Sequence, residues 1–231
     1  MNYGACVTVR LSSKRLPRKA LVDVCGEPSI YWLCRQLRQS TIPFVICTSI
    51  ESSDDDIEKY CLRNGIDCFR GSELDVLDRM VGAAKMFGFD VFLRVTGDDL
   101  FVDPDYVKLA IEQHDGSDFA YTNLPKGTDF QLVNLEYAEK TLEEWQGRDT
   151  EYLTWIFNST PRQQFLKLMD EDINYAFELD EVNDLDNIRF LVESLKSREI
   201  FHVYDLINVA TESGRFPIKY TIDRRTYNVI T

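Results

Sequence analysis

The stretch Tyr3–Lys19, YGACVTVRLSSKRLPRK, passes from an apolar run into a basic one. Its first part, Tyr3–Val9, is mostly apolar and rich in β-branched residues, which favours a buried strand. The polar residues that follow favour a loop, and a helix is expected to begin near Pro28. A strand, a loop and a helix in this order form the first unit of an alternating α/β chain.

The alternation of strands and helices continues along the chain. From Glu73 to Gly88, apolar residues recur at spacings of three or four and predict a helix with one buried face. Because crossovers between parallel strands are right-handed, the whole pattern predicts a mainly parallel sheet with helices on both faces. The residues of that helix face are Leu74, Leu77, Val81 and Ala84. Further strands are expected at Ile42–Thr48, Asp67–Phe69, Asp90–Val95, Phe119–Thr122, Phe130–Val133 and Tyr175–Leu179, and further helices within Ser52–Gly65 and at Asp105–Gln113, Leu135–Trp145, Thr150–Phe157 and Leu185–Leu195.

Length and composition indicate one globular domain. A chain of 231 residues is closer to one domain of about 150 residues with extensions than to two, so residues 1–231 are treated as a single domain with an irregular C-terminal tail. With 44% hydrophobic residues, 11 Gly and 7 Pro, the composition excludes a disordered or collagen-like chain. No apolar run approaches the ~20 residues that span a bilayer, and the first residues lack the layout of a secretory signal. A cytoplasmic protein is expected.

The charge balance argues against two classes of partner. The chain has 26 Lys and Arg against 39 Asp and Glu, a formal net charge of -13, which repels DNA and anionic lipid. We therefore expect neither a nucleic acid nor a membrane as partner. The cysteines lack a C-x-x-C pair and are expected to be buried or bystander thiols rather than metal ligands or disulfides. They are Cys6, Cys25, Cys34, Cys47, Cys61 and Cys68.

The loop after the first strand is strongly cationic. Five cations and no acid lie within Arg10–Lys19, where an even spread of the chain's cations gives about one. Ser12 and Ser13 add small hydroxyl side chains at the end of a strand, where ligands bind in parallel sheets. These features favour a polyphosphate site, although a solvated basic turn accounts for them as well. The absence of G-x-x-x-x-G-K-[ST] and of G-x-G-x-x-G argues against a P-loop kinase or a dinucleotide-binding protein.

Acidic residues follow two of the later predicted strands. They are Asp98, in T-G-D-D, and Asp180, in L-D-E-V. Mg²⁺ needs only one or two carboxylates together with water and phosphate oxygens, so we select these two residues as metal ligands. Taken singly, each is equally well a helix cap or a solvated acid. Asp103 precedes Pro104 and is expected to be a cap.

Four blocks of the sequence, in order, resemble a known family. RLSSKRLPRKALVDVCGEP (Arg10–Pro28), FRGSELDVLDR (Phe69–Arg79), LRVTGDDLFVDP (Leu93–Pro104) and LDEVNDLDNIR (Leu179–Arg189) are similar to the blocks of the CMP-sugar synthetases, the acylneuraminate cytidylyltransferase family. The likeness is greatest to the branch called spore coat polysaccharide biosynthesis protein F. It implies a Rossmann-like nucleotidyltransferase fold, a mixed sheet, a projecting dimerisation or acceptor element around residues 124–160, and a homodimer.

The resemblance also implies an activity and a set of site residues. Members transfer CMP from CTP, with Mg²⁺ as cofactor, to an anionic acceptor such as a sialic or Kdo-like sugar acid, and release pyrophosphate for surface polysaccharide synthesis. Carried over residue by residue, the catalytic residues are Arg10, Arg15, Lys19 and Asp98, and the metal ligands are Asp98 and Asp180. The nucleotide-binding residues are Arg10, Leu11, Ser12, Ser13, Arg15, Lys19, Asp78, Arg79, Thr96 and Gly97. The acceptor-binding residues are Gly127, Asp129, Glu151 and Tyr152.

The sequence departs from the family at several positions. Ser12 and Arg18 stand where relatives often have Gly, and Glu181-Val182 replaces the usual Thr-Pro after Asp180. These changes leave two alternatives open: CTP-dependent activation of a phosphate or phosphonate monoester, and a nucleotide-binding module without catalysis. The histidines, His114 and His202, lie outside the four blocks and are expected to be structural, so no general base is assigned.

Overall fold

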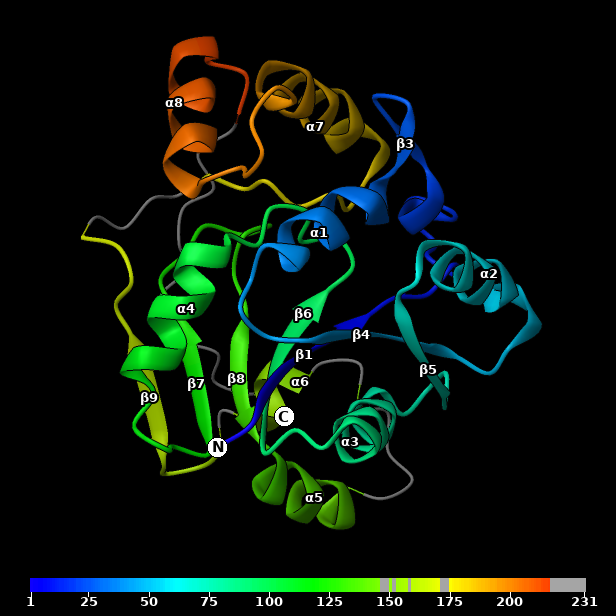
Figure 1. Cartoon of the computed structure of the whole chain (residues 1–231), viewed down its shortest axis with the longest axis vertical. Coiled ribbons are helices and arrows are strands. Elements are labelled where there is room, and N and C mark those ends of the chain that lie inside the picture. Colours follow the sequence, from blue (N-terminus) through cyan, green and yellow to red (C-terminus); the bar gives the residue numbers. More distant parts are fainter. Residues whose placement is uncertain (146–149, 151–152, 158, 171–174, 217–231) are drawn as a thin grey trace, which may run out of the picture.

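The computed structural model describes residues 1–145, 150, 153–157, 159–170 and 175–216. Its centre is a seven-stranded sheet in the order β5-β4-β1-β6-β8-β7-β9 (Figure 1). All neighbouring strands are parallel except β8, which is antiparallel to both β6 and β7. The strands are β1 (Tyr3–Thr8), β4 (Phe44–Ser49), β5 (Asp67–Gly71), β6 (Val91–Thr96), β7 (Phe119–Thr122), β8 (Gln131–Asn134) and β9 (Gln163–Leu166). The prediction of a mainly parallel mixed sheet is confirmed.

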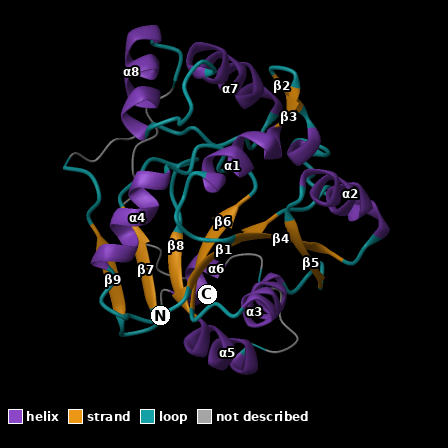
Figure 2. Ribbon diagram, viewed as in Figure 1, coloured by secondary structure: helices purple, strands orange, loops and turns teal. Residues whose placement is uncertain are grey.

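Helices cover both faces of this sheet, as predicted (Figures 1 and 2). One face packs against α1 (Ser29–Arg38), α2 (Asp55–Asn64), α4 (Pro104–Gln113), α7 (Val182–Leu195) and α8 (Val203–Ser213). The other packs against α3 (Val76–Phe87), α5 (Leu135–Glu144) and α6 (Leu153–Phe157). Two short 3-10 helices, η1 (Lys19–Leu21) and η2 (Ser52–Asp54), and the small hairpin of β2 (Asp23–Val24) and β3 (Glu27–Pro28) complete the described elements.

The apolar strands divide their side chains between two cores. In β1, Ala5 and Val7 point into one core and Cys6 into the other, because successive side chains of a strand alternate between faces. In β4, Ile46 lies in the first core and Val45 in the second. The apolar runs read as strands in the sequence are therefore buried on both sides, as parallel sheets require.

Several sequence predictions need correction. Tyr175–Leu179 is not a strand: it runs extended, with one isolated bridge from Ala176 to Lys126. Leu74 is 69% exposed, because the Asp75 carboxylate caps α3 and the helix starts only at Val76. The strand β9 and the helix α8 were not predicted.

The segment around residues 124–160, where a projecting element is predicted, includes parts of the main sheet and of its helical cover. Its strand β8 pairs with β6 and β7, and its helix α5 packs against α3. The dimeric role of this element stays a prediction, and residues 146–149, 151–152 and 158 lie outside the described part. So does most of the expected tail, residues 217–231. Within the described residues, no helix is both long and apolar enough to cross a membrane.

Candidate functional site

The cationic loop is anchored at its base by a buried carboxylate. Asp54 is 1% exposed and accepts a 2.8 Å hydrogen bond from the Leu11 amide. The same carboxylate accepts bonds from the amide and the hydroxyl of Ser49, at the end of β4. The loop closes on itself where the Arg18 amide donates to the Leu11 carbonyl. Residues 11–18 thus form a closed turn whose exposed cations stand at the carboxyl end of the parallel strands.

The end of this loop orients Lys19. Arg18 has a φ of 56°, in the left-handed region, and η1 begins directly after it. The Ser29 hydroxyl, at the start of α1, donates a 2.5 Å bond to the Lys19 carbonyl and holds this turn. Arg18 itself points outward and pairs with Asp56 at 2.8 Å. A side chain at this φ carries a steric penalty that Gly would avoid.

A tight turn at the end of β6 presents Asp98. The Asp99 amide donates to the Thr96 carbonyl, and the Gly97 amide donates to the Thr8 carbonyl of β1. A Cβ on Gly97 would lie 3.0 Å from Val9 and 3.2 Å from the Thr8 carbonyl oxygen. Gly97 therefore lets the turn approach the neighbouring strand closely, which brings Asp98 next to the loop after β1.

The second acid, Asp180, arrives on the extended segment before α7. The Leu179 amide donates to the Asp98 carbonyl at 3.0 Å, so the backbones that carry the two acids are bonded to each other. The amides of Asp180 and Glu181 donate to the Asp184 carboxylate, which forms a capping box at the start of α7. This cap fixes the backbone at Asp180 and leaves its carboxylate for other partners.

Lys19, Asp98 and Asp180 meet at one point. The Lys19 Nζ lies 2.7 Å from Asp98 Oδ2 and 3.3 Å from Asp180 Oδ1. Arg15 also pairs with Asp180 through an otherwise exposed side chain. Burial by itself raises the pKa of the Asp98 carboxyl, but the charge and hydrogen bond of Lys19 outweigh it and hold the pKa below its usual value. Two carboxylates side by side offer hard oxygen donors, which suit a divalent cation such as Mg²⁺.

The loop around Gly127, which is predicted to bind the acceptor, packs against the segment that carries Asp180. Gly127 has a φ of 85°, and a Cβ there would lie 2.2 Å from the Phe177 carbonyl carbon. The Phe177 amide donates to the Lys126 carbonyl, and the Phe101 amide donates to the Gly127 carbonyl. The structure therefore requires Gly at position 127, because only a residue without a side chain lets the segment that carries Asp180 pack against the loop. The resemblance to the family did not indicate this requirement.

A partly buried charged group interacts with acids of this loop and of the turn after β6. Arg94, on β6, donates a 2.7 Å bond to Gln131 on β8. Its positive charge acts on Asp99, Asp129 and Asp98. Burial raises the pKa of Asp99 well above its usual value, and the charges of Asp129 and Asp98 raise it further. The predicted acceptor residue Asp129 is therefore linked electrostatically to the turn that carries Asp98.

The other predicted residues lie around this centre at different depths. Arg79 is 2% exposed and donates to the Ser72 carbonyl, whereas Asp78 is exposed on α3. Ser12 donates to Glu73 at 3.0 Å, so the loop also contacts the segment before α3. Ser13 accepts from the Leu16 amide within the loop. Glu151 and Tyr152 lie outside the described residues.

Sequence reasoning missed three residues of this centre, namely Asp54, Arg94 and Asp99. Asp54 lies in the predicted helix within Ser52–Gly65 and Asp99 in the motif T-G-D-D, and neither was selected as a site residue. Arg94 carried a signal that could have been used, since a cation in an otherwise apolar strand must find a partner when it is buried.

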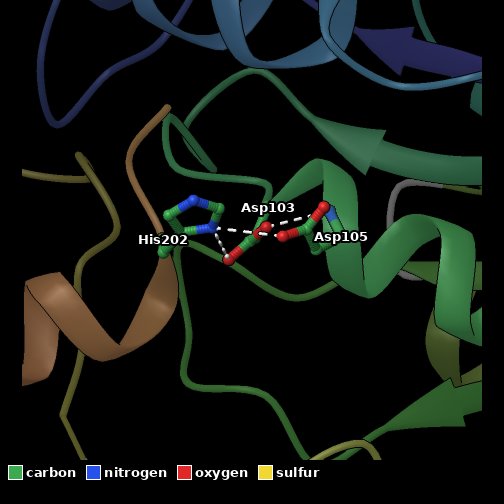
Figure 3. A group of neighbouring side chains, drawn as sticks. All are labelled: Asp103, Asp105 and His202. Carbon is green, nitrogen blue, oxygen red and sulfur yellow. Dashed lines mark hydrogen bonds and ion pairs between the residues drawn. The ribbon is translucent and has the colours of Figure 1, made fainter. Parts of the chain in front are cut away.

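A further group of acids and a histidine lies at the joint between α4 and α8 (Figure 3). Asp103 Oδ1 accepts from the Asp105 amide at 2.9 Å and Oδ2 accepts from the Val203 amide at 3.0 Å. Asp103 therefore caps α4, as predicted, and also bonds the first turn of α8. The Nδ1 of His202 lies 3.4 Å from Asp103 and 3.6 Å from Asp105. The contacts of this group join two helices.

Comparison with known proteins gives consistent matches. The cytidylyltransferase family matches residues 5–152. The chain is 30% identical over 219 residues to spore coat polysaccharide biosynthesis protein SpsF of Bacillus subtilis, covering 88% of this chain and 91% of that protein. It is 31% identical over 163 residues to 3-deoxy-manno-octulosonate cytidylyltransferase of Chlorobium limicola, covering 64% of this chain and 61% of that protein.

Solved structures agree on the fold. A cytidylyltransferase from Leptospira borgpetersenii superposes with a TM-score of 0.85 at 23% identity, covering 93% of this chain and 95% of that one. A CMP:2-keto-3-deoxy-manno-octonic acid synthetase complexed with CTP superposes with a TM-score of 0.61 at 12% identity, covering 84% of this chain and 99% of that one. The predicted resemblance and the predicted nucleotidyltransferase fold are confirmed.

Proposed function

This chain belongs to the cytidylyltransferase family and is a CTP-dependent nucleotidyltransferase, and we propose that it transfers CMP from CTP to a 3-deoxy-ulosonic sugar acid and releases pyrophosphate. One observation carries the proposal: a lysine of the cationic loop lies against the two carboxylates that follow β6 and precede α7. Cations for a triphosphate and oxygen donors for a divalent metal are thereby brought to one place.

The cations of the loop would bind the triphosphate. Arg15 and Lys19 already stand next to the two acids, and Arg10 lies where β1 ends. Positive charges held close to the leaving pyrophosphate stabilise the negative charge that develops on it. Among the loop cations Arg15, Arg18 and Lys19, which form ion pairs, Lys19 is the least exposed, at 17%. It is therefore the best placed to act close to the bond that breaks.

Asp98 and Asp180 would hold Mg²⁺. Magnesium bound by these two carboxylates would supply positive charge for the phosphates and would lower the pKa of an attacking hydroxyl group, so no dedicated base is assigned. The bond between the Leu179 amide and the Asp98 carbonyl keeps the two carboxylates together before any ligand binds. A related structure from Mycobacterium tuberculosis is described as a complex with manganese, which supports a divalent metal on this fold.

A sugar acid is supported as acceptor by the relatives. One is named for spore coat polysaccharide biosynthesis and another for 3-deoxy-manno-octulosonate. Near the predicted acceptor residues Gly127 and Asp129, Arg94 supplies a positive charge that can offset the charge of an anionic acceptor. The homodimer and the cytoplasmic location implied by the resemblance belong to the same proposal.

A pyrophosphate-release assay tests this function. The protein is incubated with CTP and Mg²⁺ and with a panel of acceptors: Kdo, N-acetylneuraminate, a phosphomonoester, a phosphonate, and none. We expect release that depends on one of the two sugar acids and falls about 100-fold or more in Asp98→Asn. The matched change Asp186→Asn, on an acid that is 83% exposed, leaves the rate unchanged. Release with the phosphomonoester or phosphonate alone, or with no acceptor at all, contradicts the proposal.

A further inference from the structure

Lys19 occupies the position that a metal on Asp98 and Asp180 would need. Its Nζ lies 2.7 Å from Asp98 Oδ2 and also contacts Asp180 Oδ1 at 3.3 Å. Mg²⁺ binds carboxylate oxygens at about 2.0–2.1 Å, so an ion on the same Asp98 oxygen would stand beside the ammonium group. The three side chains are only 17–22% exposed, so little water screens the repulsion between the two cations.

Among the four side chains in direct contact at this point, the charges balance. Two carboxylates face two cations, since Arg15 pairs with Asp180 and Lys19 bridges both acids. A divalent ion entering alone would add two positive charges to a neutral cluster. A triphosphate entering with the ion changes this, because its anionic oxygens offer Lys19 and Arg15 new partners and leave the carboxylates to the metal.

We propose that Lys19 keeps divalent metal away from Asp98 and Asp180 in the nucleotide-free enzyme and releases both carboxylates when a triphosphate binds. The metal then binds together with the nucleotide and not before it. This inference rests on the proposed function, and it adds an order of assembly to the same site. By linkage, removal of the Lys19 charge strengthens metal binding in the absence of nucleotide, while it weakens binding of the triphosphate.

The backbone around Lys19 is held in place, which supports an exchange of its side-chain partners from carboxylates to phosphates. Lys19 lies in η1, and its carbonyl accepts a hydrogen bond from Ser29. The backbone therefore stays in place while the long side chain can turn from the acids to a phosphate. The Arg15 side chain is 63% exposed, which leaves it room to turn. The exchange thus needs side-chain rotation only, without movement of β1, β6 or α7.

Binding of Mn²⁺ without nucleotide tests the inference. Free Mn²⁺ is followed by its electron paramagnetic resonance signal at pH 8 with wild type, Lys19→Met and Lys14→Met. The last variant removes a cation from the same loop, at an exposed position. We expect Lys19→Met to bind one Mn²⁺ at least 10-fold more tightly than wild type, and Lys14→Met to behave as wild type. Lys19→Gln, which keeps a hydrogen-bond donor, replaces Lys19→Met if the latter does not fold.

The location of the gained metal is checked with a double variant. Lys19→Met combined with Asp98→Asn is expected to lose the gain, because the ion then lacks one of its two carboxylates. Equal Mn²⁺ affinity in wild type and Lys19→Met overturns the inference, and so does a gain that survives in the double variant. Turnover of CTP by the wild type is measured separately, so a failure of the proposed function and a failure of this inference give different results.

Discussion

The loop 10–19 and the segment 175–181 both supply charges to one centre, but they are held in place by different means. The loop is fixed at its base by the Asp54 carboxylate and presents long cations on flexible side chains. The segment is fixed by backbone contacts, with Lys126, Gly127 and Asp98, and presents one short carboxylate. One region carries charge that can move, whereas the other carries charge that is built into the packing.

This difference predicts how each region responds to substitution. A change in the loop's cations should alter binding while the fold survives, because exposed side chains contribute little to stability. A change in the backbone that supports Asp180 should alter fold and activity together. Variants of Gly127, Asp54 and Arg18 test this contrast.

The largest effect is expected for Gly127→Ala. The added Cβ meets backbone atoms of Phe177 and Glu178 at 2.2–2.5 Å, and φ is positive, so we expect a loss of about 3 kcal/mol or more in the free energy of unfolding and no CTP turnover. Gly65→Ala is the matched control, since Gly65 also has a positive φ but has open space around it, and it should cost about 1 kcal/mol. Chemical denaturation measures both. Equal losses in the two variants would show that the contact with 177–178 is unimportant.

A smaller effect is expected for Asp54→Asn, which probes the anchored base of the loop. The amide group of Asn cannot accept from Ser49 as the second carboxylate oxygen does, so we expect a loss of about 2 kcal/mol and a raised KM for CTP. Asp55→Asn, at the neighbouring exposed acid, should cost less than about 1 kcal/mol. An unchanged KM in a destabilised Asp54→Asn would mean that the loop keeps its shape without this anchor.

The prediction for Arg18 separates conformation from charge. Arg18→Gly and Arg18→Ala both remove the exposed pair with Asp56, but only Gly relieves the left-handed φ of 56°. Thermal unfolding should therefore find the Gly variant more stable than the Ala variant by about 1 kcal/mol. If Ala proves as stable as Gly, the turn before Lys19 is not strained.

The smallest effect concerns His114, which is remote from both regions. It contacts the Tyr3 hydroxyl at 3.0 Å, and burial lowers the pKa of its ring below the usual value. The unfolded chain then takes up a proton first as the pH falls through about 6.5, so this contribution to stability is present at pH 8 and is lost in mild acid. His114→Gln should lose less stability than wild type between pH 8 and pH 5.5, measured as the shift in Tm. An identical shift in both proteins contradicts this.

The sequence was most informative where local pattern decides structure. Strands such as β1 and β4 are mostly apolar runs, and caps such as Asp103 before Pro104 act within a few residues. The loop 10–19 was also identified locally, from its excess of cations. These features depend on neighbours in the chain, so the residues themselves carry the signal.

The sequence predictions failed where contacts between distant segments of the chain decide the structure. The segment 175–179 has the composition of a strand, but it forms only one isolated bridge, to Lys126, and is not part of either sheet. The edge strand β9 is short and partly polar, and it is a strand because β7 pairs with it. The structural need for Gly127 is equally invisible in the sequence, since it depends on contact with residues 177–178.

The most direct test of the account is the position of Mn²⁺ in crystals grown with CTP, located by its anomalous scattering. We expect one ion bonded to a carboxylate oxygen of Asp98 and one of Asp180, with the Lys19 ammonium moved from these acids to the phosphates. An ion held elsewhere, or Lys19 still seated between Asp98 and Asp180 with the nucleotide bound, would contradict it.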